Sequence, residues 1–310
     1  MLAQQDSIDI YELDLSQLSK LKIESATKVS QEIKEVPATI YIISAKQIEE
    51  AGYFTLEEAL SDLPGFQFRN IIGLNSYDFQ RGIPNQNNLT LLLIDGVMIN
   101  ELNSGGFYGG GQYNLSNVER IEVIYGPSSV IYGTNAVSGI INIVTKSAKD
   151  ERFGIKTLAG NFNTFASDIN YCYVSENEDF GISVAGMIKK SDKADLRSEA
   201  GDNNWSDLME NYENDYTFDV KADYKDFSFG TNYMYKQTSI STLIKSTGTF
   251  YKDYGTEWNI QFVNNYLKYN KLLNDKLNFS SVVYNRNATV LGNSIYYVTD
   301  TAQIGYYRPN

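Results

Sequence analysis

The second half of the chain alternates between apolar and polar residues. In "YTFDVKADY" every second residue is apolar: Tyr216, Phe218, Val220, Ala222 and Tyr224. Successive side chains of a β-strand point to opposite faces, so this pattern predicts a strand with one apolar and one polar face. The segments "FGISVAGMI", "FSFGTNYMY", "EWNIQFVNNY" and "KLNFSSVVYN" repeat it. Residues 150–310 therefore predict about seven or eight antiparallel strands, of either a membrane barrel or a soluble sandwich.

Residues 36–149 combine helix and strand signals. "SAKQIEEAG" predicts a helix, because Ser44 is a favoured N-cap and the final glycine a favoured stop. "TLEEALSDLPG" predicts a second helix, with Thr55 and Glu58 as a capping box. "LTLLLIDGVMIN" predicts a hairpin around its Asp-Gly pair, and "VERIEVIYG" and "SGIINIVTK" predict further strands. We therefore expect an α+β domain here.

The remaining segment, residues 1–35, is polar and charged with short apolar islands, and we expect a flexible leader. The longest uninterrupted apolar run covers only residues 91–94. A transmembrane helix needs about 18 apolar residues, so a helical membrane protein is excluded.

The amino-acid composition argues against several classes of function. The net charge of −12 argues against nucleic acid as a partner, because phosphate binding needs clustered lysine and arginine. The chain has no histidine and one cysteine, Cys172, which removes histidine-based catalysis, a cysteine metal cluster and an intrachain disulfide. We therefore expect neither an enzyme nor a bound cofactor. The 24 tyrosines suit a surface that contacts an apolar medium on one side and water on the other, because tyrosine combines an apolar ring with a polar hydroxyl.

Three segments together resemble a known family. They are "SATKVSQEIKEVPATIYIISAKQIEEAGYFTLEEALSDLPGFQF", "FQRGIPNQNNLTLLLIDGVMIN" and "LSNVERIEVIYGPSSVIYGTNAVSGIINIVTK". In this order they resemble the plug domain of TonB-dependent outer-membrane receptors, over residues 24–146. The resemblance implies a plug inside a barrel of about 22 strands. Residues 150–310 would supply only its first part, so we expect the chain to be part of a longer protein.

The resemblance also implies partners and a location. The protein would lie in the outer membrane of a Gram-negative bacterium, in contact with lipid, with its N-terminus in the periplasm. TonB would bind a short leader segment by adding a strand to it. The segment we favour consists of Lys22, Ile23, Glu24, Ser25 and Ala26. Residues 8–12, "IDIYE", are the second candidate.

Two loops of the resembling region are candidates for ligand contact. "FQFRNIIGLNSYDF" offers Phe68, Arg69, Tyr77 and Asp78. "NSGGFYGGGQYN" is expected to expose Phe107, Tyr108, Gln112 and Tyr113 on a glycine-rich backbone. Aromatic and hydrogen-bonding groups on a loop suit capture of a small organic or metal-chelate ligand. A flexible glycine-rich surface loop without ligand is the alternative.

Contacts between plug and barrel are expected at five further residues: Arg81, Arg120, Glu122, Tyr125 and Tyr132. The resemblance implies that Arg81 pairs with barrel carboxylates. Arg120 and Glu122 share one strand face, so a charge-paired contact is expected there. Tyr125 and Tyr132 are expected to direct their hydroxyls to the barrel. Many relatives have arginine where this chain has Tyr125, so neutral contacts are expected to replace one ionic anchor.

The resemblance favours energy-coupled import of a scarce ligand. A ferric siderophore is our first choice, since siderophores enclose their iron and require no protein ligands to the metal. Cobalamin and glycans are the alternatives within the family. A signalling role also stays open. A secreted β-rich adhesin or carbohydrate-binding module is the alternative outside it.

Overall fold

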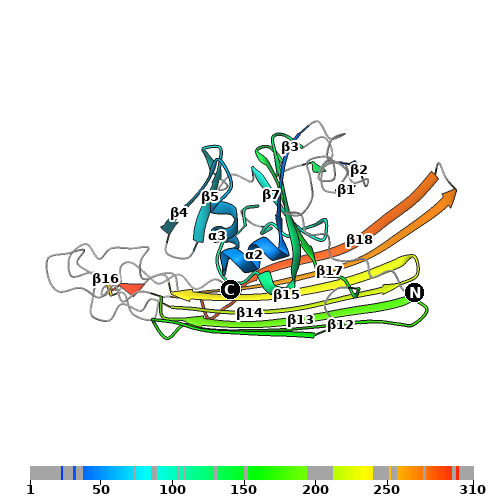
Figure 1. Cartoon of the computed structure of the whole chain (residues 1–310). Coiled ribbons are helices and arrows are strands. Elements are labelled where there is room, and N and C mark those ends of the chain that lie inside the picture. The colour runs from blue at the N-terminus through cyan, green and yellow to red at the C-terminus, as the bar shows by residue number, and fades with distance from the viewer. Residues whose placement is uncertain are drawn as a thin grey trace.

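The computed structural model describes two connected parts, an N-terminal domain within residues 38–149 and a curved sheet within residues 153–290 (Figure 1). The described residues are 22–23, 31–32, 38–72, 75–84, 89–102, 105–107, 109–128, 132–133, 135–149, 153–193, 212–239, 251–252, 257–274, 277–294 and 298–299.

A five-stranded sheet forms the centre of the N-terminal domain. Its strand order is β3 (Thr39–Ser44), β9 (Val118–Tyr125), β10 (Gly139–Thr145), β7 (Thr90–Ile94) and β8 (Val97–Met98). β10 runs parallel to β7, and the other neighbours are antiparallel. β7 and β8 form the predicted hairpin. Asp95 and Gly96 at its tip have φ of 48° and 75°, as a tight two-residue turn requires.

Both predicted helices are present. The Ser44 side chain caps α2 (Ala45–Ala51), which ends at a glycine in the left-handed conformation. Thr55 and Glu58 form the expected capping box of α3 (Leu56–Ser61). These local signals satisfy the free backbone amides of each first turn, so both helices begin where the sequence predicts.

Smaller elements accompany the five-stranded sheet and the curved sheet. A short 3-10 helix, η3 (Leu115–Asn117), precedes β9. An antiparallel sheet contains β4 (Phe66–Ile72), β5 (Asn75–Gln80) and β6 (Ile83–Pro84). Two short pairs are β1 (Lys22–Ile23) with β2 (Gln31–Glu32), and β16 (Tyr251–Lys252) with β19 (Val298–Thr299).

The curved sheet has seven strands, and each pairs antiparallel with its neighbour. In spatial order they are β11 (Phe153–Ala159), β12 (Phe165–Val174), β13 (Phe180–Ser191), β14 (Glu213–Tyr224), β15 (Phe227–Ser239), β17 (Glu257–Asn274) and β18 (Leu277–Val290). The order follows the chain, so this is the up-and-down arrangement that the alternating pattern predicts.

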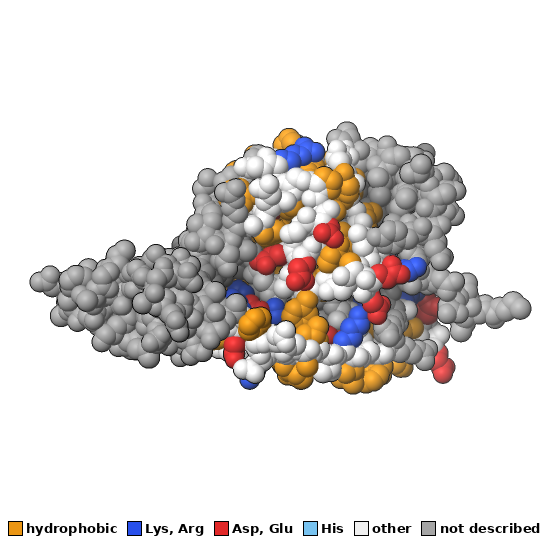
Figure 2. All heavy atoms as spheres, turned by 60° about the vertical axis from the view of Figure 1, so that its left-hand side comes forward, with side chains coloured by type: hydrophobic (Ala, Val, Ile, Leu, Met, Phe, Trp, Pro, Cys, Tyr) orange, Lys and Arg blue, Asp and Glu red, His pale blue; other side chains and the backbone are white. Residues whose placement is uncertain are grey.

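The two faces of this sheet are reversed relative to those of a water-soluble sheet. On β14, Phe218 and Tyr224 are 49% and 55% exposed, whereas Asp215 and Thr217 on the opposite face are buried. Figure 2 shows hydrophobic side chains along the outside of the sheet and charged ones where the N-terminal domain meets it. An apolar outer face and a polar inner face are typical of membrane-barrel strands and disfavour the soluble sandwich. Within the described ranges, no helix is long and apolar enough to cross a membrane.

The N-terminal domain lies against the polar, concave face of the sheet (Figure 1). The main hydrophobic cluster joins the two parts, since it contains Leu56 and Ile121 of the domain and Met234, Ile260 and Phe262 of the sheet. The domain therefore packs its core against the sheet as well as within itself.

Candidate functional site

The tip of the β7–β8 hairpin contacts the curved sheet through Asp95. Lys221 Nζ lies 3.6 Å from Asp95 Oδ1, and the Tyr266 hydroxyl donates to Oδ2 at 3.2 Å. The Lys268 ammonium group donates to the Asp95 backbone carbonyl. From the domain itself, the amide and hydroxyl of Thr145 donate to the carboxylate at 2.9 and 2.7 Å. One carboxylate thus connects β10 of the domain to β14 and β17 of the sheet.

This carboxylate is held in its charged form. Burial by itself would raise the pKa of Asp95, but the Lys221 and Lys268 ammonium groups and the hydrogen bonds from Thr145 outweigh burial. The pKa therefore lies below its ordinary value. A carboxylate that stays ionised keeps both attractions to the sheet at neutral pH.

The position of Tyr266 depends on a glycine in the neighbouring strand. Tyr266 pairs in register with Gly230 on β15. A Cβ at Gly230 would lie 2.1 Å from Cζ of the Tyr266 ring, so no other residue leaves room for the ring there. The Lys268 ammonium group lies 4.7 Å from the same ring centre. Gly230 thus allows Tyr266 to lean across the sheet toward Asp95.

A chain of polar contacts continues from the hairpin tip into the domain. The Gly96 amide donates to Asn142 Oδ1 at 3.0 Å, and Asn142 Nδ2 donates to Glu122 at 3.2 Å. Arg120 pairs with the buried Glu122 at 2.8 Å. The contact at Asp95 is therefore connected to the central strands β10 and β9.

A second contact is made by the glycine-rich loop after β8. A Cβ at Gly110 would lie 2.6 Å from Lys236 Nζ, and one at Gly111 would lie 2.2 Å from Lys189 Nζ. Both lysines project from the inner face of the sheet and are buried. The loop contains glycines here because the lysine side chains occupy the space that a Cβ would need.

The sheet neutralises these lysines with its own carboxylates. Lys189 Nζ is 2.6 Å from a Glu213 oxygen, and Lys236 Nζ is 3.8 Å from an Asp215 oxygen. Lys193 lies 3.7 Å from the other oxygen of Glu213. Buried charges require partners, and the ion pairs of these lysines are made with β14, while Glu57 of α3 adds a further negative charge from the N-terminal domain.

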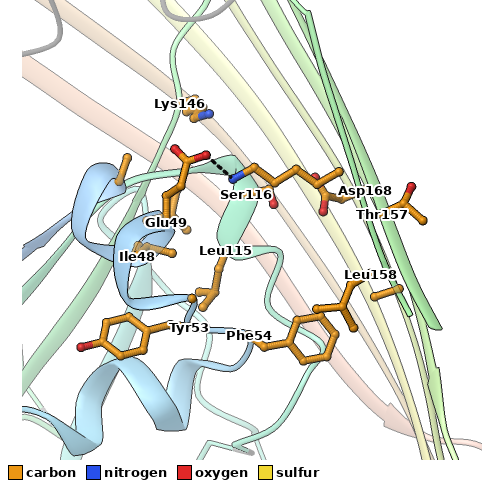
Figure 3. Close-up of a pocket in the computed structure, with 15 residues that line it drawn as sticks. Ile48, Glu49, Tyr53, Phe54, Leu115, Ser116, Lys146, Thr157, Leu158 and Asp168 are labelled. Carbon is orange, nitrogen blue, oxygen red and sulfur yellow. Dashed lines mark ion pairs between the residues drawn. The ribbon is translucent and has the colours of Figure 1, made fainter. Parts of the chain in front are cut away.

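On the opposite side of the domain, a cavity of about 460 Å³ separates it from β11 and β12. Its lining includes Ile48, Glu49, Tyr53, Leu115, Lys156 and Asp168 (Figure 3). Across it, Glu49 and Lys156 approach to 3.6 Å, with side chains 69% and 52% exposed. A side-chain hydrogen bond between Ser116 of η3 and Asp168 of β12 also joins the domain to this side of the sheet.

Comparison with known proteins identifies the domain. The family model of the TonB-dependent receptor plug domain matches residues 32–140. The chain contains a TonB-dependent receptor plug domain. Its packing against the inner face of an antiparallel sheet agrees with this family.

Named relatives are similar over about half of this chain. The rhizobactin receptor of Rhizobium meliloti (strain 1021) is 34% identical over 178 residues, which cover 51% of this chain and 22% of that protein. The vitamin B12 transporter BtuB of Vibrio vulnificus (strain CMCP6) is 28% identical over 179 residues, which cover 56% and 28%. The chain thus spans about a quarter of the length of the curated relatives it matches.

Solved structures share the fold. The siderophore receptor PiuA from Acinetobacter baumannii matches with a TM-score of 0.61 and 20% identity, covering 88% of this chain and 40% of that chain. The plug domain followed by antiparallel strands is therefore the fold of this family.

The structure contradicts the predicted exposure of three candidate ligand-contact residues. Phe107, Gln112 and Tyr113 are buried, so the prediction that they are exposed is wrong. Phe107 and Tyr113 belong to the core shared with the sheet, and burial raises the pKa of Tyr113. Thr217 of β14 donates a hydrogen bond to the Gln112 backbone carbonyl, so this loop contacts the sheet.

The other candidate loop also contains a buried residue. Asp78 on β5 is fully buried, and burial raises its pKa to about 8, so the carboxyl is unavailable at the surface. Phe68 is partly buried, and its ring stacks on that of Phe66 with 6.5 Å between the ring centres. For Arg69 and Tyr77 only the backbone pairing of β4 with β5 is described. Tyr108 lies outside the described residues.

Of the plug–barrel contacts predicted at Arg81, Tyr125 and Tyr132, the one at Tyr125 is made within the plug domain instead, and the other two stay predictions. The Tyr125 hydroxyl donates to the Pro64 carbonyl at 2.8 Å, so the prediction that it reaches the sheet is wrong. The Arg81 guanidinium lies 4.8 Å from the Tyr125 ring centre rather than beside a described carboxylate of the sheet. Tyr132 packs on a small core cluster that includes Ile124.

The Tyr125 side chain stays inside the domain for a local reason. Tyr125 is buried, and its ring packs edge-on against Tyr41 and Phe66, which fixes its direction. Arg120 and Glu122 pair with each other on β9, so pairing between either residue and the sheet stays a prediction. In the first candidate segment for TonB binding, Lys22 and Ile23 form β1, and residues 24–26 lie outside the described residues. The second candidate, residues 8–12, also lies outside them.

The residues that make the contact at Asp95 were not predicted from the sequence. Asp95 was recognised only as part of a turn, and its partners lie on strands at least 126 residues further along the chain. The alternation in "YTFDVKADY" places Lys221 on the polar face of its strand. This alternation is the sequence signal that could have identified Lys221, one of the three residues of the sheet that contact Asp95.

Proposed function

We propose that the chain is part of an outer-membrane importer that takes up a ferric siderophore. The observation that carries the proposal is a plug domain seated on the polar face of a sheet whose other face is apolar. The apolar face would contact outer-membrane lipid, and the plug would lie in the lumen. The named relatives are receptors and transporters, so we infer transport rather than enzyme catalysis.

The cargo is inferred from the relatives. The match to the rhizobactin receptor has the highest identity of the two relatives described above, and several similar structures are siderophore receptors. A siderophore encloses its iron, so the absence of histidine from the sequence is no obstacle. Cobalamin is the second candidate, because the BtuB match extends over 179 residues.

TonB is the proposed source of energy for uptake. Its proposed binding segment comprises Lys22, Ile23, Glu24, Ser25 and Ala26, since an extended segment ahead of the plug can add a strand to a partner. In the structure, Lys22 and Ile23 pair with Glu32 and Gln31. The segment would exchange these few backbone hydrogen bonds for bonds to TonB.

The test is uptake in cells lacking their own iron receptors. Cells expressing the protein from its full reading frame should accumulate radiolabelled iron from a ferric catecholate or hydroxamate siderophore, but not labelled vitamin B12. Deletion of residues 22–26 should abolish uptake and leave surface binding intact, whereas deletion of residues 8–12 should not. Accumulation of vitamin B12 alone would replace the siderophore proposal with the cobalamin one, and accumulation of neither would refute both.

A further inference from the structure

The outer face of the curved sheet changes character between β14 and β18. On β14 the side chains of this face are all aromatic or aliphatic: Tyr216, Phe218, Val220, Ala222 and Tyr224. On β18 the same face carries Asn285, Asn287 and Thr289 next to Val283. Uncharged polar side chains therefore interrupt the apolar surface at one side of the sheet.

On β18, a contact with the N-terminal domain fixes which side chains point outward. The Arg286 guanidinium donates to the Asn100 carbonyl at 3.2 Å, so Arg286 points to the inner face. Successive side chains of a strand alternate between its faces, so Asn285, Asn287 and Thr289 point outward. All three of these outward side chains are exposed.

The neighbouring strand β17 adds one more polar residue to this surface. Asn264 is buried and donates to Asn232 of β15 on the inner face, so the next residue, Asn265, points outward. Asn265 pairs directly with Asn285, and side chains of such a pair are neighbours on one face. We call Asn265, Asn285, Asn287 and Thr289 the outer polar patch.

The outer polar patch lies well inside the strands rather than at their ends. Asn265 is midway along β17, and Asn285 is near the middle of β18. A barrel strand crosses the hydrocarbon core of a membrane with about 9–11 residues. Both carboxamides would therefore lie at the depth of the lipid tails, which offer no hydrogen bonds.

Most of the hydrogen-bonding capacity of the patch is unused. The Thr289 hydroxyl donates to Asn287 Oδ1 at 2.7 Å. The carboxamides of Asn265 and Asn285 make no hydrogen bond with the residues that the structure describes. A polar group without a partner is costly in an apolar medium, so the patch needs a partner other than lipid tails.

The chemistry of the patch defines this partner. The patch carries no charge, so it does not select a charged ligand or a charged lipid headgroup. Each carboxamide both donates and accepts hydrogen bonds, so such a patch is complementary to another of the same kind. A two-fold axis places identical surfaces of two copies against each other. Within membranes, asparagine and threonine side chains stabilise contacts between protein segments.

We propose that the outer polar patch binds a second copy of the protein within the membrane, in a two-fold symmetric dimer whose asparagine carboxamides bond across the interface. The outward neighbours Val263, Leu267 and Val283 would surround these bonds and exclude water. This inference rests on the proposed location in the outer membrane and not on the identity of the cargo.

Crosslinking in isolated outer membranes tests the contact, with the protein expressed from its full reading frame. Asn285→Cys in a Cys172→Ser background places the sole thiol in the patch. The matched control is Val184→Cys in the same background, because Val184 of β13 lies in the same cross-strand row as Asn285. A short bismaleimide should give at least about tenfold more dimer from Asn285→Cys, because a specific contact holds its two thiols at high effective concentration.

The composition of the crosslinked product identifies the partner. When two copies with different epitope tags are expressed together, the product should contain both tags. A product that contains one tag and a different membrane protein would overturn the second copy as the partner. Equal yields from Asn285→Cys and Val184→Cys would overturn the patch as a contact surface.

A leucine variant tests the carboxamides themselves. Asn265→Leu combined with Asn285→Leu removes both groups and leaves an apolar outer face, which suits barrel strands in lipid. In detergent micelles, analytical ultracentrifugation should show a dimer dissociation constant at least about tenfold higher than in the parent protein. The control, Val184→Leu combined with Val220→Leu, should change this constant less than about twofold. An unchanged constant in the asparagine variant would refute the role of the carboxamides.

Cell fractionation separates this inference from the proposed function. Protein that reaches the outer membrane and takes up siderophore, but stays monomeric in both assays, would refute the dimer alone. A dimer in the outer membrane of cells that accumulate no siderophore would support the inference and refute the proposed cargo. Absence of the protein from the outer membrane would refute both.

Discussion

The hairpin tip at residues 95–96 and the glycine loop at residues 110–111 both meet lysines of the sheet, but in opposite ways. Asp95 supplies a negative charge and backbone oxygen to Lys221 and Lys268. The loop has no side chains at Gly110 and Gly111, which leaves room for Lys236 and Lys189, and both lysines pair with carboxylates of the neighbouring strand β14.

The difference shows that a glycine-rich loop can be a packing surface. From the sequence, the glycine loop is a candidate for ligand contact or a flexible surface loop, and the hairpin tip is a chain reversal. In the structure, the loop is shaped to fit the sheet, and the tip makes an electrostatic contact with it. Substitutions can therefore separate a contact that depends on charge from one that depends on shape.

The largest effect is expected from Asp95→Ala. It leaves two lysines near an empty buried site, which should lower the free energy of unfolding of the plug by about 3–5 kcal/mol. The measurement is urea unfolding followed by fluorescence of Trp258, which packs against the shared core, in a Trp205→Phe background. The control Asp226→Ala should cost less than about 1 kcal/mol, and equal losses in the two variants would show that Asp95 has no special role.

A smaller loss is expected from Gly111→Val. The new Cβ would overlap Lys189, whose ammonium group is fixed 2.6 Å from Glu213, so overpacking should cost about 1–3 kcal/mol. The same fluorescence assay measures it. A second substitution, Lys189→Ala, removes the overlapping side chain and should recover part of the loss. If the double variant is as unstable as the sum of the two single variants, the overlap is not the cause.

Gly96→Ala should cost about 1–2 kcal/mol, because the φ of 75° is unfavourable for a residue with a Cβ. No atom lies within 4 Å of the new Cβ, so the cost comes from the backbone alone. Gly96→Asn should therefore lose less, since asparagine tolerates this conformation. A loss as large for asparagine as for alanine would indicate a steric contact instead.

The smallest effect concerns pH. Because the folded-state pKa of Asp95 lies below its ordinary value, the stability it supplies is complete above about pH 4 and is lost as pH falls through the lower folded pKa. The difference in unfolding free energy between parent and Asp95→Ala should thus be constant from pH 5 to 8. Urea titrations at several pH values measure it, and a difference that shrinks steadily across that range would contradict an ionised Asp95.

Local features of the fold were predictable from the sequence. Ser44 and Thr55 mark helix starts through their own side-chain bonds, and the hairpin follows from two residues that adopt positive φ. The alternation of β14 predicts its two faces because the strand period is two. Each of these signals acts within a few residues of the chain.

The site itself depends on distant residues. Asp95 and Tyr266 are 171 positions apart, and no local pattern relates them. Burial of Phe107 and Tyr113 likewise requires the sheet that covers them, which composition cannot reveal. The direction of Tyr125 is set by Tyr41 and Phe66, again through packing of separate elements.

The strand order of the plug domain has a mechanical consequence. β3 is an edge strand, held by a single neighbour, β9, and is the first strand of the five-stranded sheet along the chain, whereas β9, β10 and β7 are each flanked on both sides. Tension transmitted along residues 1–38 therefore reaches an edge strand of this sheet before any of its interior strands. Removal of β3 from the sheet would expose one edge of β9 and leave β9 paired with β10, and β10 paired with β7.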